Sequence, residues 1–319
     1  MLASRPSRAG GSILELGEGN AELRCNLECV AVGHVERYVP PHLFRSYVSP
    51  MTDHRILSAH LQTLGRVVLG YSGGVDSALL AVAGTRALGR ENFLAVIGRS
   101  ASYPEDQYDT AFQLAREFGI PVREIDTREL SDPRYLSNST ERCYFCKSEL
   151  WTRLGELATE IGFDTVIDGT NADDLGEHRP GLRASREQAV RSPLAELGWT
   201  KARVRAAAQS LGLPTWNAPA APCLSSRVMY GISITPERLR QVELGESFLR
   251  SIGVTGDIRV RHHGDKARLE LQPDQMERVR DQWARVEATF LGLGFHAVEL
   301  DPHGYRRGGL LALASQLPD

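Results

Sequence analysis

The sequence predicts an α/β protein in which a doubly wound parallel sheet is followed by a smaller C-terminal α+β domain. From residue 66 onward, short apolar runs alternate with amphipathic helical segments, a pattern typical of a parallel sheet with helices on both faces. Pro214, Pro219 and Pro222 then interrupt the helical pattern. A second helix–strand pattern with different spacing follows them. We therefore expect a domain boundary near residue 214.

The first domain takes its elements from this alternation. Strands are predicted near 67–71, 93–98, 122–126 and 164–168, and helices near 76–89, 105–118, 147–161 and 200–211. Ligands of such sheets bind at the carboxyl ends of the strands. The loops expected there are polar or rich in glycine, namely 72–74, 99–102, 126–128 and 168–174. We predict that they form the active face.

The second domain begins with a proline-started helix from Thr235-Pro236-Glu237 to about Arg250. Strands near 257–263, 267–272 and 296–300 and a helix near 274–292 complete it. The chain thus divides into residues 1–50, 51–214 and 215–319. The last part combines a cysteine-bearing connection with a domain for substrate binding and oligomerisation.

Residues 1–50 show no clear element pattern. Met51 is followed by the helix-start signal Thr52-Asp53 and an amphipathic run that leads into the first strand. We expect residues 1–50 to be a disordered extension, or the natural product to start at Met51.

Composition narrows the class of protein. A formal net charge of -3 does not favour a bulk nucleic-acid binder. No apolar run reaches transmembrane length, and residues 1–20 lack the apolar core of a secretory signal. We therefore expect a cytoplasmic protein without a membrane partner. In a cytoplasmic chain we expect the five cysteines to serve as metal ligands, catalytic groups or core residues rather than to form disulfides.

The stretch 67–77 has the pattern of an anion site. An apolar strand breaks into Ser72-Gly73-Gly74, and a helix begins at Asp76 and Ser77. Free N–H groups and the positive end of the helix dipole would then face one point. Asp76 near phosphates suggests a bound cation. No lysine follows, so this is not the common lysine-containing phosphate loop. The alternative is an accidental Gly-Gly turn before a buried helix.

Three cysteines lie near the predicted active face. Cys143 and Cys146 form a C-x-x-C pair, and Cys223 lies in the connection between domains. Three thiolates without a fourth fit a [4Fe–4S] cluster with one open iron. The alternatives are a redox pair with Cys223 as a separate nucleophile, or buried small apolar residues. Cys25 and Cys29 have no motif that ties them to this site.

Charged residues suggest further ligand groups. Asp173 and Asp174 are candidate Mg²⁺ ligands, with helix capping as the alternative. Arg259 and Arg261 share one face of a predicted strand and suit phosphate or carboxylate recognition. A solvated sheet edge is the alternative there. Neighbouring histidines 262 and 263 are candidate acid–base groups or hydrogen-bonded structural residues.

The hexapeptide SGGVDS resembles the PP-loop of the ATP pyrophosphatase superfamily, whose fold is adenine nucleotide alpha-hydrolase-like. A wider set of segments resembles one family, the LarE-type ATP-dependent sulfur transferases of nickel-pincer nucleotide biosynthesis. The segments are YSGGVDSALL, RCYFCK, DGTNADDLGEHRPG, RSPLAELGWTK, PTWNAPAAPCLSSR, RVRHHGDKARLEL and GYRRGG, and they span most of residues 60–310.

This resemblance implies a reaction. ATP adenylates a carboxylate of pyridinium-3,5-biscarboxylic acid mononucleotide, pyrophosphate leaves, and sulfur then replaces AMP to give a thiocarboxylate. The resemblance also implies Mg²⁺, a sulfide donor, a downstream nickel-insertion enzyme and a homo-oligomer. The implied catalytic residues are Asp76, Cys143, Cys146 and Cys223. Those implied for ATP are Ser72, Gly73, Gly74, Asp76, Ser77, Arg99, Ser100, Gly169 and Thr170, and those for the substrate are Arg227, Arg259 and Arg261.

Some family members sacrifice the sulfur of a cysteine that matches Cys223, whereas others add the C-x-x-C pair and resemble cluster enzymes. Cys143 and Cys146 place this chain with the second group, and the sacrificial route is the alternative. A second alternative is a PP-loop tRNA thiolation enzyme, although neither an RNA-binding nor a zinc module is recognisable. A third is a non-catalytic ATP or cluster sensor.

Overall fold

The computed structural model describes residues 50–176, 180–219 and 221–306 of the chain. The expected extension therefore lies outside the described residues, apart from Pro50, as do Cys25 and Cys29. The described residues belong to one compact unit.

The first sheet consists of four parallel strands in the order β3-β2-β1-β4 within the described residues. Val67 of β1 lies opposite Phe93 of β2 on one side and Thr165 of β4 on the other. The order changes direction at β1, so the loop after β1 opens at a switch point of the sheet, where such folds bind ligands. The predicted doubly wound sheet is confirmed. Its strands are β1 (Val67–Gly70), β2 (Phe93–Arg99), β3 (Val122–Asp126) and β4 (Thr165–Ile167).

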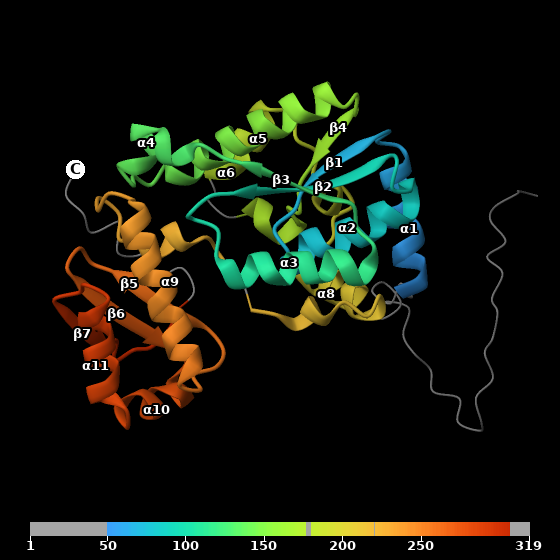
Figure 1. The fold of residues 1–319 in the computed structure, drawn as a ribbon. Coiled ribbons are helices and arrows are strands. Elements are labelled where there is room, and N and C mark those ends of the chain that lie inside the picture. Colours follow the sequence, from blue (N-terminus) through green and yellow to red (C-terminus); the bar gives the residue numbers. More distant parts are fainter. Residues whose placement is uncertain (1–49, 177–179, 220, 307–319) are drawn as a thin grey trace, which may run out of the picture. The chain divides into compact units, whose positions relative to one another are not determined.

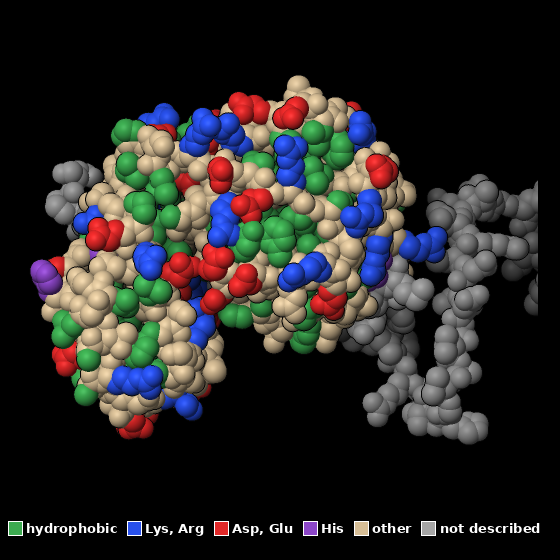
Figure 2. Space-filling model, in the orientation of Figure 1, with side chains coloured by type: hydrophobic (Ala, Val, Ile, Leu, Met, Phe, Trp, Pro, Cys, Tyr) green, Lys and Arg blue, Asp and Glu red, His purple; other side chains and the backbone are tan. Residues whose placement is uncertain are grey.

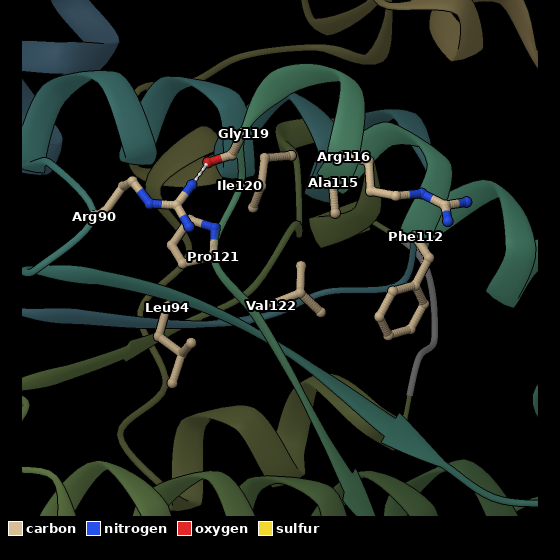
Figure 3. A pocket seen from close by; sticks show the side chains of 9 residues that line it. All are labelled: Arg90, Leu94, Phe112, Ala115, Arg116, Gly119, Ile120, Pro121 and Val122. Atoms are coloured by element: carbon tan, nitrogen blue, oxygen red, sulfur yellow. Dashed lines mark hydrogen bonds between the residues drawn. The ribbon is translucent and has the colours of Figure 1, made fainter.

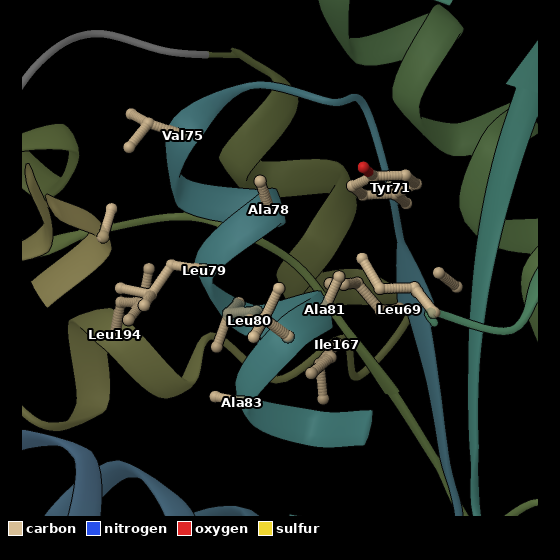
Figure 4. Packing of buried hydrophobic residues seen from close by; sticks show 14 of the residues in the cluster. Leu69, Tyr71, Val75, Ala78, Leu79, Leu80, Ala81, Ala83, Ile167 and Leu194 are labelled. Atoms are coloured by element: carbon tan, nitrogen blue, oxygen red, sulfur yellow. The ribbon is translucent and has the colours of Figure 1, made fainter. Parts of the chain in front are cut away.

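Helices cover both faces of this sheet (Figure 1). One face packs against α1 (Pro50–Gln62), α2 (Val75–Leu88), α3 (Glu105–Phe118) and α8 (Lys201–Ser210), and the other against α5 (Arg142–Glu160) and α6 (Pro180–Glu187). Because both faces are covered, the strands can be apolar throughout rather than alternating. Figure 4 shows Leu69 and Ile167 of the sheet packed against Leu80 and Ala81 of α2, directly behind the loop after β1.

The helices around the first sheet differ from the prediction in two ways. α5 begins at Arg142 rather than near residue 147, because the buried Arg142 guanidinium fixes the first turn through hydrogen bonds to Asn138 and Ser225. The short segments α4 (Pro133–Leu136) and α7 (Pro193–Glu196), as well as α6, were not predicted. Four to eight residues are too few for a clear helical period. Single 3₁₀ turns occur at η2 (Glu129–Ser131), η3 (Ala172–Gly176), η4 (Pro214–Asn217), η5 (Leu224–Arg227) and η6 (Pro273–Gln275).

The second sheet has the order β5-β6-β7, with β5 antiparallel and β7 parallel to β6. The smaller α+β domain is confirmed, but its second helix is divided. At Gln282 the backbone N–H bonds to Val279, three residues back, and this tightening ends the first part. The elements are α9 (Pro236–Ser251), β5 (Ile258–His262), β6 (Lys266–Leu271), α10 (Met276–Arg280), α11 (Trp283–Gly292) and β7 (Ala297–Leu300).

The apolar core of the second sheet includes residues from the first half of the chain. Tyr135 packs in it, and Phe145 and Cys146 of α5 lie against it. The boundary near residue 214 thus stays a prediction. No helix among the described residues is long and apolar enough to cross a membrane. Figure 2 shows acidic and basic side chains interspersed over one face, which carries no continuous basic stripe.

Candidate active site

The loop after β1 presents bare backbone to a ligand. Gly73 has φ +71°, and a Cβ there would lie 2.8 Å from the Cβ of Ala111 in α3, so only glycine fits. Gly74 is the N-cap of α2 in extended conformation, and within the described residues no side chain caps the first-turn N–H groups. These donors and the helix dipole are therefore available to an anion.

Hydrogen bonds hold this phosphate loop, residues 72–77, in one conformation. The Ser77 hydroxyl accepts from the Ser72 N–H at 3.2 Å and donates to the Gly74 carbonyl at 3.1 Å. From the other side, Tyr103 and Gln107 donate to the Ser72 carbonyl at 2.9 and 2.7 Å. The loop is thus organised before any ligand arrives, which lowers the entropy lost on binding.

Asp76 is the centre of a polar network. Its carboxylate forms an ion pair with Lys201, the first residue of α8, and accepts from Asn171 Nδ2 at 3.2 Å. The Lys201 N–H donates to Asp173 Oδ2 at 2.8 Å. The Asn171 N–H donates to Asp174 Oδ2 at 3.1 Å. The network brings the N-terminus of α2, η3 and the N-terminus of α8 together.

The neighbouring Gly169 allows this approach. A Cβ on Gly169 would lie 3.1 Å from the Ser77 nitrogen and 3.2 Å from the Asp76 Cβ. Thr170 next to it donates through both its N–H and its hydroxyl to the buried Asp168, at 3.0 and 2.9 Å. The predicted residues Gly169 and Thr170 therefore lie beside the phosphate loop.

Arg99 and Ser100 lie at the end of β2. Arg99 pairs with Glu105 at 2.8 Å and lies over the Tyr108 ring, 3.8 Å from its centroid. With Tyr103 and residues of α9, both line a cavity of about 610 Å³. A second cavity of about 500 Å³ lies between α3 and the edge of the sheet, flanked by Arg90 and Arg116 (Figure 3). None of the predicted site residues lines that second cavity.

The three cysteines share one region of the structure. Cys143 and Cys146 lie in the first two turns of α5, and Cys223 is the N-cap of η5. Burial raises the pKa of the Cys146 thiol, and the nearby charges of Cys223, Glu129 and Cys143 add to the rise. Within the described residues, however, no group of three cysteine, histidine or acidic side chains is already placed to hold a metal ion.

A buried cation accompanies the cysteines. Arg142 donates to the Asn138 side chain and, at 2.9 Å, to the Ser225 carbonyl. Burial lowers the pKa of Arg142, but the nearby Cys223 and Cys143, together with Tyr230 and Tyr135, more than reverse this, so that the net pKa is raised. A guanidinium beside two thiols is a charge environment suited to anionic sulfur.

The predicted substrate arginines are buried in ion pairs. Arg227 pairs with Glu246 at 3.0 Å, and each side chain is only 3% exposed. Arg261 pairs with Glu270 at 2.8 Å. Arg259 lies over the Tyr305 ring and pairs with Asp257 at 3.3 Å. Since the side chains are buried, the alternative of a solvated sheet edge does not apply.

These arginines also fix the connection that carries Cys223. Arg227 Nη1 donates to the carbonyls of Pro222 and Cys223, the latter at 3.0 Å. Arg261 Nη1 donates to the Ser226 carbonyl at 2.9 Å. On the opposite side, the Leu224 N–H donates to the Ser102 carbonyl at 2.8 Å. The Cys223 loop is thus held between the second sheet and the loop after β2.

Comparison with known proteins places this chain among relatives of known families. Residues 54–147 match the NAD synthase family. The chain is 44% identical over 249 residues to an uncharacterized protein of Synechocystis, covering 77% of this chain and 92% of the relative. It is 37% identical over 257 residues to the pyridinium-3,5-bisthiocarboxylic acid mononucleotide synthase of Lactiplantibacillus plantarum, covering 81% and 93%. The chain belongs to the LarE-type family of PP-loop, ATP-dependent sulfur transferases.

A weaker similarity concerns tRNA thiolation. The cytoplasmic tRNA 2-thiolation protein 1 of Malassezia globosa is 28% identical over 148 residues, which cover 43% of this LarE-type chain and 39% of that protein. This match is partial and distant compared with the match to the mononucleotide synthase.

In this LarE-type chain, sequence reasoning missed several residues of the site. Lys201 pairs with Asp76 across 125 positions, and no local spacing signals that contact, although the quoted segment RSPLAELGWTK contains the lysine. Arg142 immediately precedes the C-x-x-C pair, and Glu129 is a single acidic residue in a loop. Glu246 and Glu270 lie within helix and strand patterns. For these four, only tertiary contacts reveal a role.

Proposed function

We propose that this LarE-type chain uses ATP to adenylate a carboxylate of pyridinium-3,5-biscarboxylic acid mononucleotide and then converts it to a thiocarboxylate for the nickel-pincer nucleotide. The observation that carries the proposal is the preformed phosphate loop at the N-terminus of α2, tied through Asp76 to Lys201. The relative from Lactiplantibacillus, named for the corresponding bisthiocarboxylic product, supports the choice of substrate.

The first step activates the carboxylate. A substrate carboxylate oxygen attacks the α-phosphorus of ATP, and the bond from that phosphorus to pyrophosphate breaks. Ser72, Gly73, Gly74 and Ser77 would bind the phosphates through backbone N–H and hydroxyl groups. Arg99, Ser100, Gly169 and Thr170 lie at the same carboxyl edge of the sheet and would bind the rest of ATP. After this step the leaving group on the acyl carbon is AMP, which leaves far more readily than oxide.

Magnesium fits the chemistry of this edge. Asp76, Asp173 and Asp174 supply carboxylate oxygens, the ligand type that Mg²⁺ prefers, within one hydrogen-bonded network. These residues would hold the ion, which would neutralise charge on the pyrophosphate. Lys201 already provides one positive charge beside Asp76.

The sulfur step takes place at the acyl carbon. A sulfur nucleophile attacks it, and AMP leaves with the electrons of the C–O bond. Cys143, Cys146 and Cys223 have the right ligand type for a [4Fe–4S] cluster, share one region, and lie beside the Arg142 cation. They would hold the cluster, which would supply sulfide at the iron that the protein leaves unligated. The alternative source is the sulfur of Cys223 itself.

The substrate's phosphate and carboxylate groups would be recognised by Arg227, Arg259 and Arg261. Burial lowers the pKa of Arg259, and the positive charge of Arg227 lowers it further, so the two guanidiniums repel each other. A bound anion would relieve this repulsion. Because Arg227 also donates to the Cys223 carbonyl, the bound substrate would lie close to the sulfur source.

Other features remain part of the proposal. We infer a cytoplasmic homo-oligomer that receives sulfide from a donor and passes its product to a nickel-insertion enzyme. Nucleic acid is not an expected partner. The division into residues 51–214 and 215–319 is likewise proposed.

Iron and acid-labile sulfide after anaerobic purification test the sulfur source. We expect about four of each per chain in the parent protein and a loss of both in Cys223→Ala. Mass spectrometry after turnover should find Cys223 intact. A colourless parent after reconstitution, with loss of one H₂S from Cys223, would establish the sacrificial route instead.

Substrate-dependent pyrophosphate release tests the adenylation itself. Release should require ATP and the biscarboxylate mononucleotide together. Release with tRNA instead, accompanied by tight and strongly salt-dependent tRNA binding, would favour the thiolation alternative. Nucleotide binding without any pyrophosphate release would favour a sensor.

A further inference from the structure

Glu129 is a buried carboxylate between the nucleotide face and the cysteines. It begins η2 after β3 and is 3% exposed. Its Oε1 accepts from the Ser100 hydroxyl at 2.5 Å and from the Ser102 hydroxyl at 3.3 Å. Its Oε2 is buried and has no hydrogen-bond partner among the described residues.

This environment gives the buried carboxylate few polar contacts. In the described part of the chain, the hydrogen bonds to the Glu129 carboxylate come from two neutral hydroxyl groups. A buried carboxylate with no cation beside it and with one oxygen lacking a hydrogen bond is costly, which makes it a candidate for a functional role. The bare oxygen thus points to a ligand that brings positive charge.

The position of Glu129 indicates which part of the ligand would reach it. The next residue, Leu130, packs in the same apolar cluster as Tyr135 and Cys146, so Glu129 lies on the side of the cysteines. Ser102, its hydrogen-bond partner, also accepts the N–H of Leu224, the residue after Cys223. Ser100 belongs to the predicted nucleotide loop. Glu129 therefore lies between the loop predicted to bind the nucleotide and the loop that carries Cys223.

We propose that Glu129 recognises the positive charge of the substrate's pyridinium ring, an inference that rests on the proposed function. The ring is bonded directly to the reacting carboxyl carbon. When that carbon lies between the nucleotide and Cys223, the ring nitrogen is only a ring's width away. The arginines bind the anionic groups of the substrate, and Glu129 selects a cationic ring over a neutral one.

Calorimetric titration of the whole protein tests this selection with two probes. Nicotinic acid mononucleotide has a cationic ring, and uridine monophosphate carries a neutral ring on the same ribose phosphate. The parent should prefer the cationic probe. Glu129→Gln keeps the shape and the hydroxyl contacts but removes the charge, and it should weaken binding of the cationic probe about tenfold while changing the neutral probe less than about twofold.

Two matched variants control for charge and for packing. Glu156→Gln removes a charge from a side chain that is 63% exposed on α5, and neither affinity should change. Ser102→Ala removes one hydroxyl contact but keeps the Glu129 charge, and the preference for the cationic probe should persist. Melting temperature and ATP affinity report whether each variant is folded.

Several outcomes would overturn the inference. They are an equal loss of affinity for both probes in Glu129→Gln, a loss of affinity for ATP alone, or no change in any affinity. Equal binding of both probes by the parent overturns it without any variant. If the parent releases pyrophosphate with its substrate but Glu129→Gln keeps the preference, only this inference fails. If the parent neither binds the cationic probe nor releases pyrophosphate, the proposed function fails as well.

Discussion

Gly73 shows how a single residue determines the phosphate loop. Its φ of +71° is a backbone conformation that side-chain-bearing residues rarely adopt, and Ala111 occupies the place of a Cβ. Gly73→Ala should therefore destabilise the fold by about 1–2 kcal/mol and weaken ATP binding at least as strongly. Urea unfolding and ATP titration measure the two effects.

The control for Gly73→Ala is Gly155→Ala in α5. A Cβ at Gly155 would meet no atom within 4 Å. Alanine in a helix interior should stabilise by about 0.5–1 kcal/mol and leave ATP binding unchanged. An unchanged ATP affinity in Gly73→Ala would mean that the phosphates bind elsewhere.

His262 makes stability depend on pH. Burial lowers its pKa to about 4, helped by the charges of Arg238 and His263. Its Nδ1 accepts from the Gly264 N–H at 3.2 Å, so the folded state needs the neutral ring. Between pH values of about 6.5 and 4, this imidazole is protonated in the unfolded chain but stays neutral in the folded chain. This contribution to stability is complete above that window and is lost as the pH falls through it.

Urea unfolding at pH 7, 5.5 and 4.5 measures this dependence. In His262→Gln the free energy of unfolding should fall less steeply with decreasing pH. The remaining fall would be due to His263, whose pKa is also lowered by burial. The control His296→Gln changes a side chain that is 82% exposed and should leave the decline as it was. A decline of equal slope in His262→Gln would disprove the assignment.

At the scale of elements, the loop after β4 connects α8 to α2. Asp173 caps the first N–H of α8, while Lys201 from the same turn reaches Asp76 in α2. The sequence suggested two alternative roles for the Asp173 carboxylate, a helix cap and a Mg²⁺ ligand. The cap is present in the structure, and the metal role is proposed.

Two substitutions of Asp173 separate these roles. Asp173→Asn keeps an acceptor for the Lys201 N–H, so stability should change by less than about 0.5 kcal/mol, whereas Asp173→Ala should lose about 1 kcal/mol. Both should raise the Mg²⁺ concentration needed for pyrophosphate release about tenfold. Normal Mg²⁺ dependence in Asp173→Asn would leave Asp173 with capping alone.

At the scale of the whole molecule, the two sheets depend on each other. Tyr135 precedes α5 but lies in the core of the second sheet, and its hydroxyl meets that of Ser225 at 2.5 Å. Arg142 also binds Ser225. Because these contacts are buried, neither half can lose its structure without exposing apolar surface and polar groups of the other.

We therefore expect one cooperative unfolding transition for the described part of the chain. Calorimetric and van't Hoff enthalpies should agree, and far-ultraviolet circular dichroism should follow tryptophan fluorescence. Tyr135→Phe should lower stability by about 1 kcal/mol without splitting the transition. Two separate transitions in the parent would instead show that the halves fold independently.

The sequence by itself determined the features that depend on local pattern. Buried parallel strands are apolar runs, helices have a 3.6-residue period, and Gly73-Gly74 before a helix indicates an anion site. These patterns were enough for the sheet, the smaller domain and the place of the phosphate loop. Short helices such as α4 and α7 carry too few residues to show a period, and they were missed.

Tertiary structure decided which side chains meet. Lys201 is 125 positions from Asp76, Leu224 bonds to Ser102 across the connection, and Arg227 is buried against Glu246. No local pattern reveals these contacts, because the two residues of each pair become neighbours only when the chain is compact. Glu129 is the clearest case. In the sequence it is one acidic residue in a loop. Only the structure reveals that one of its carboxylate oxygens is buried without a hydrogen-bond partner among the described residues.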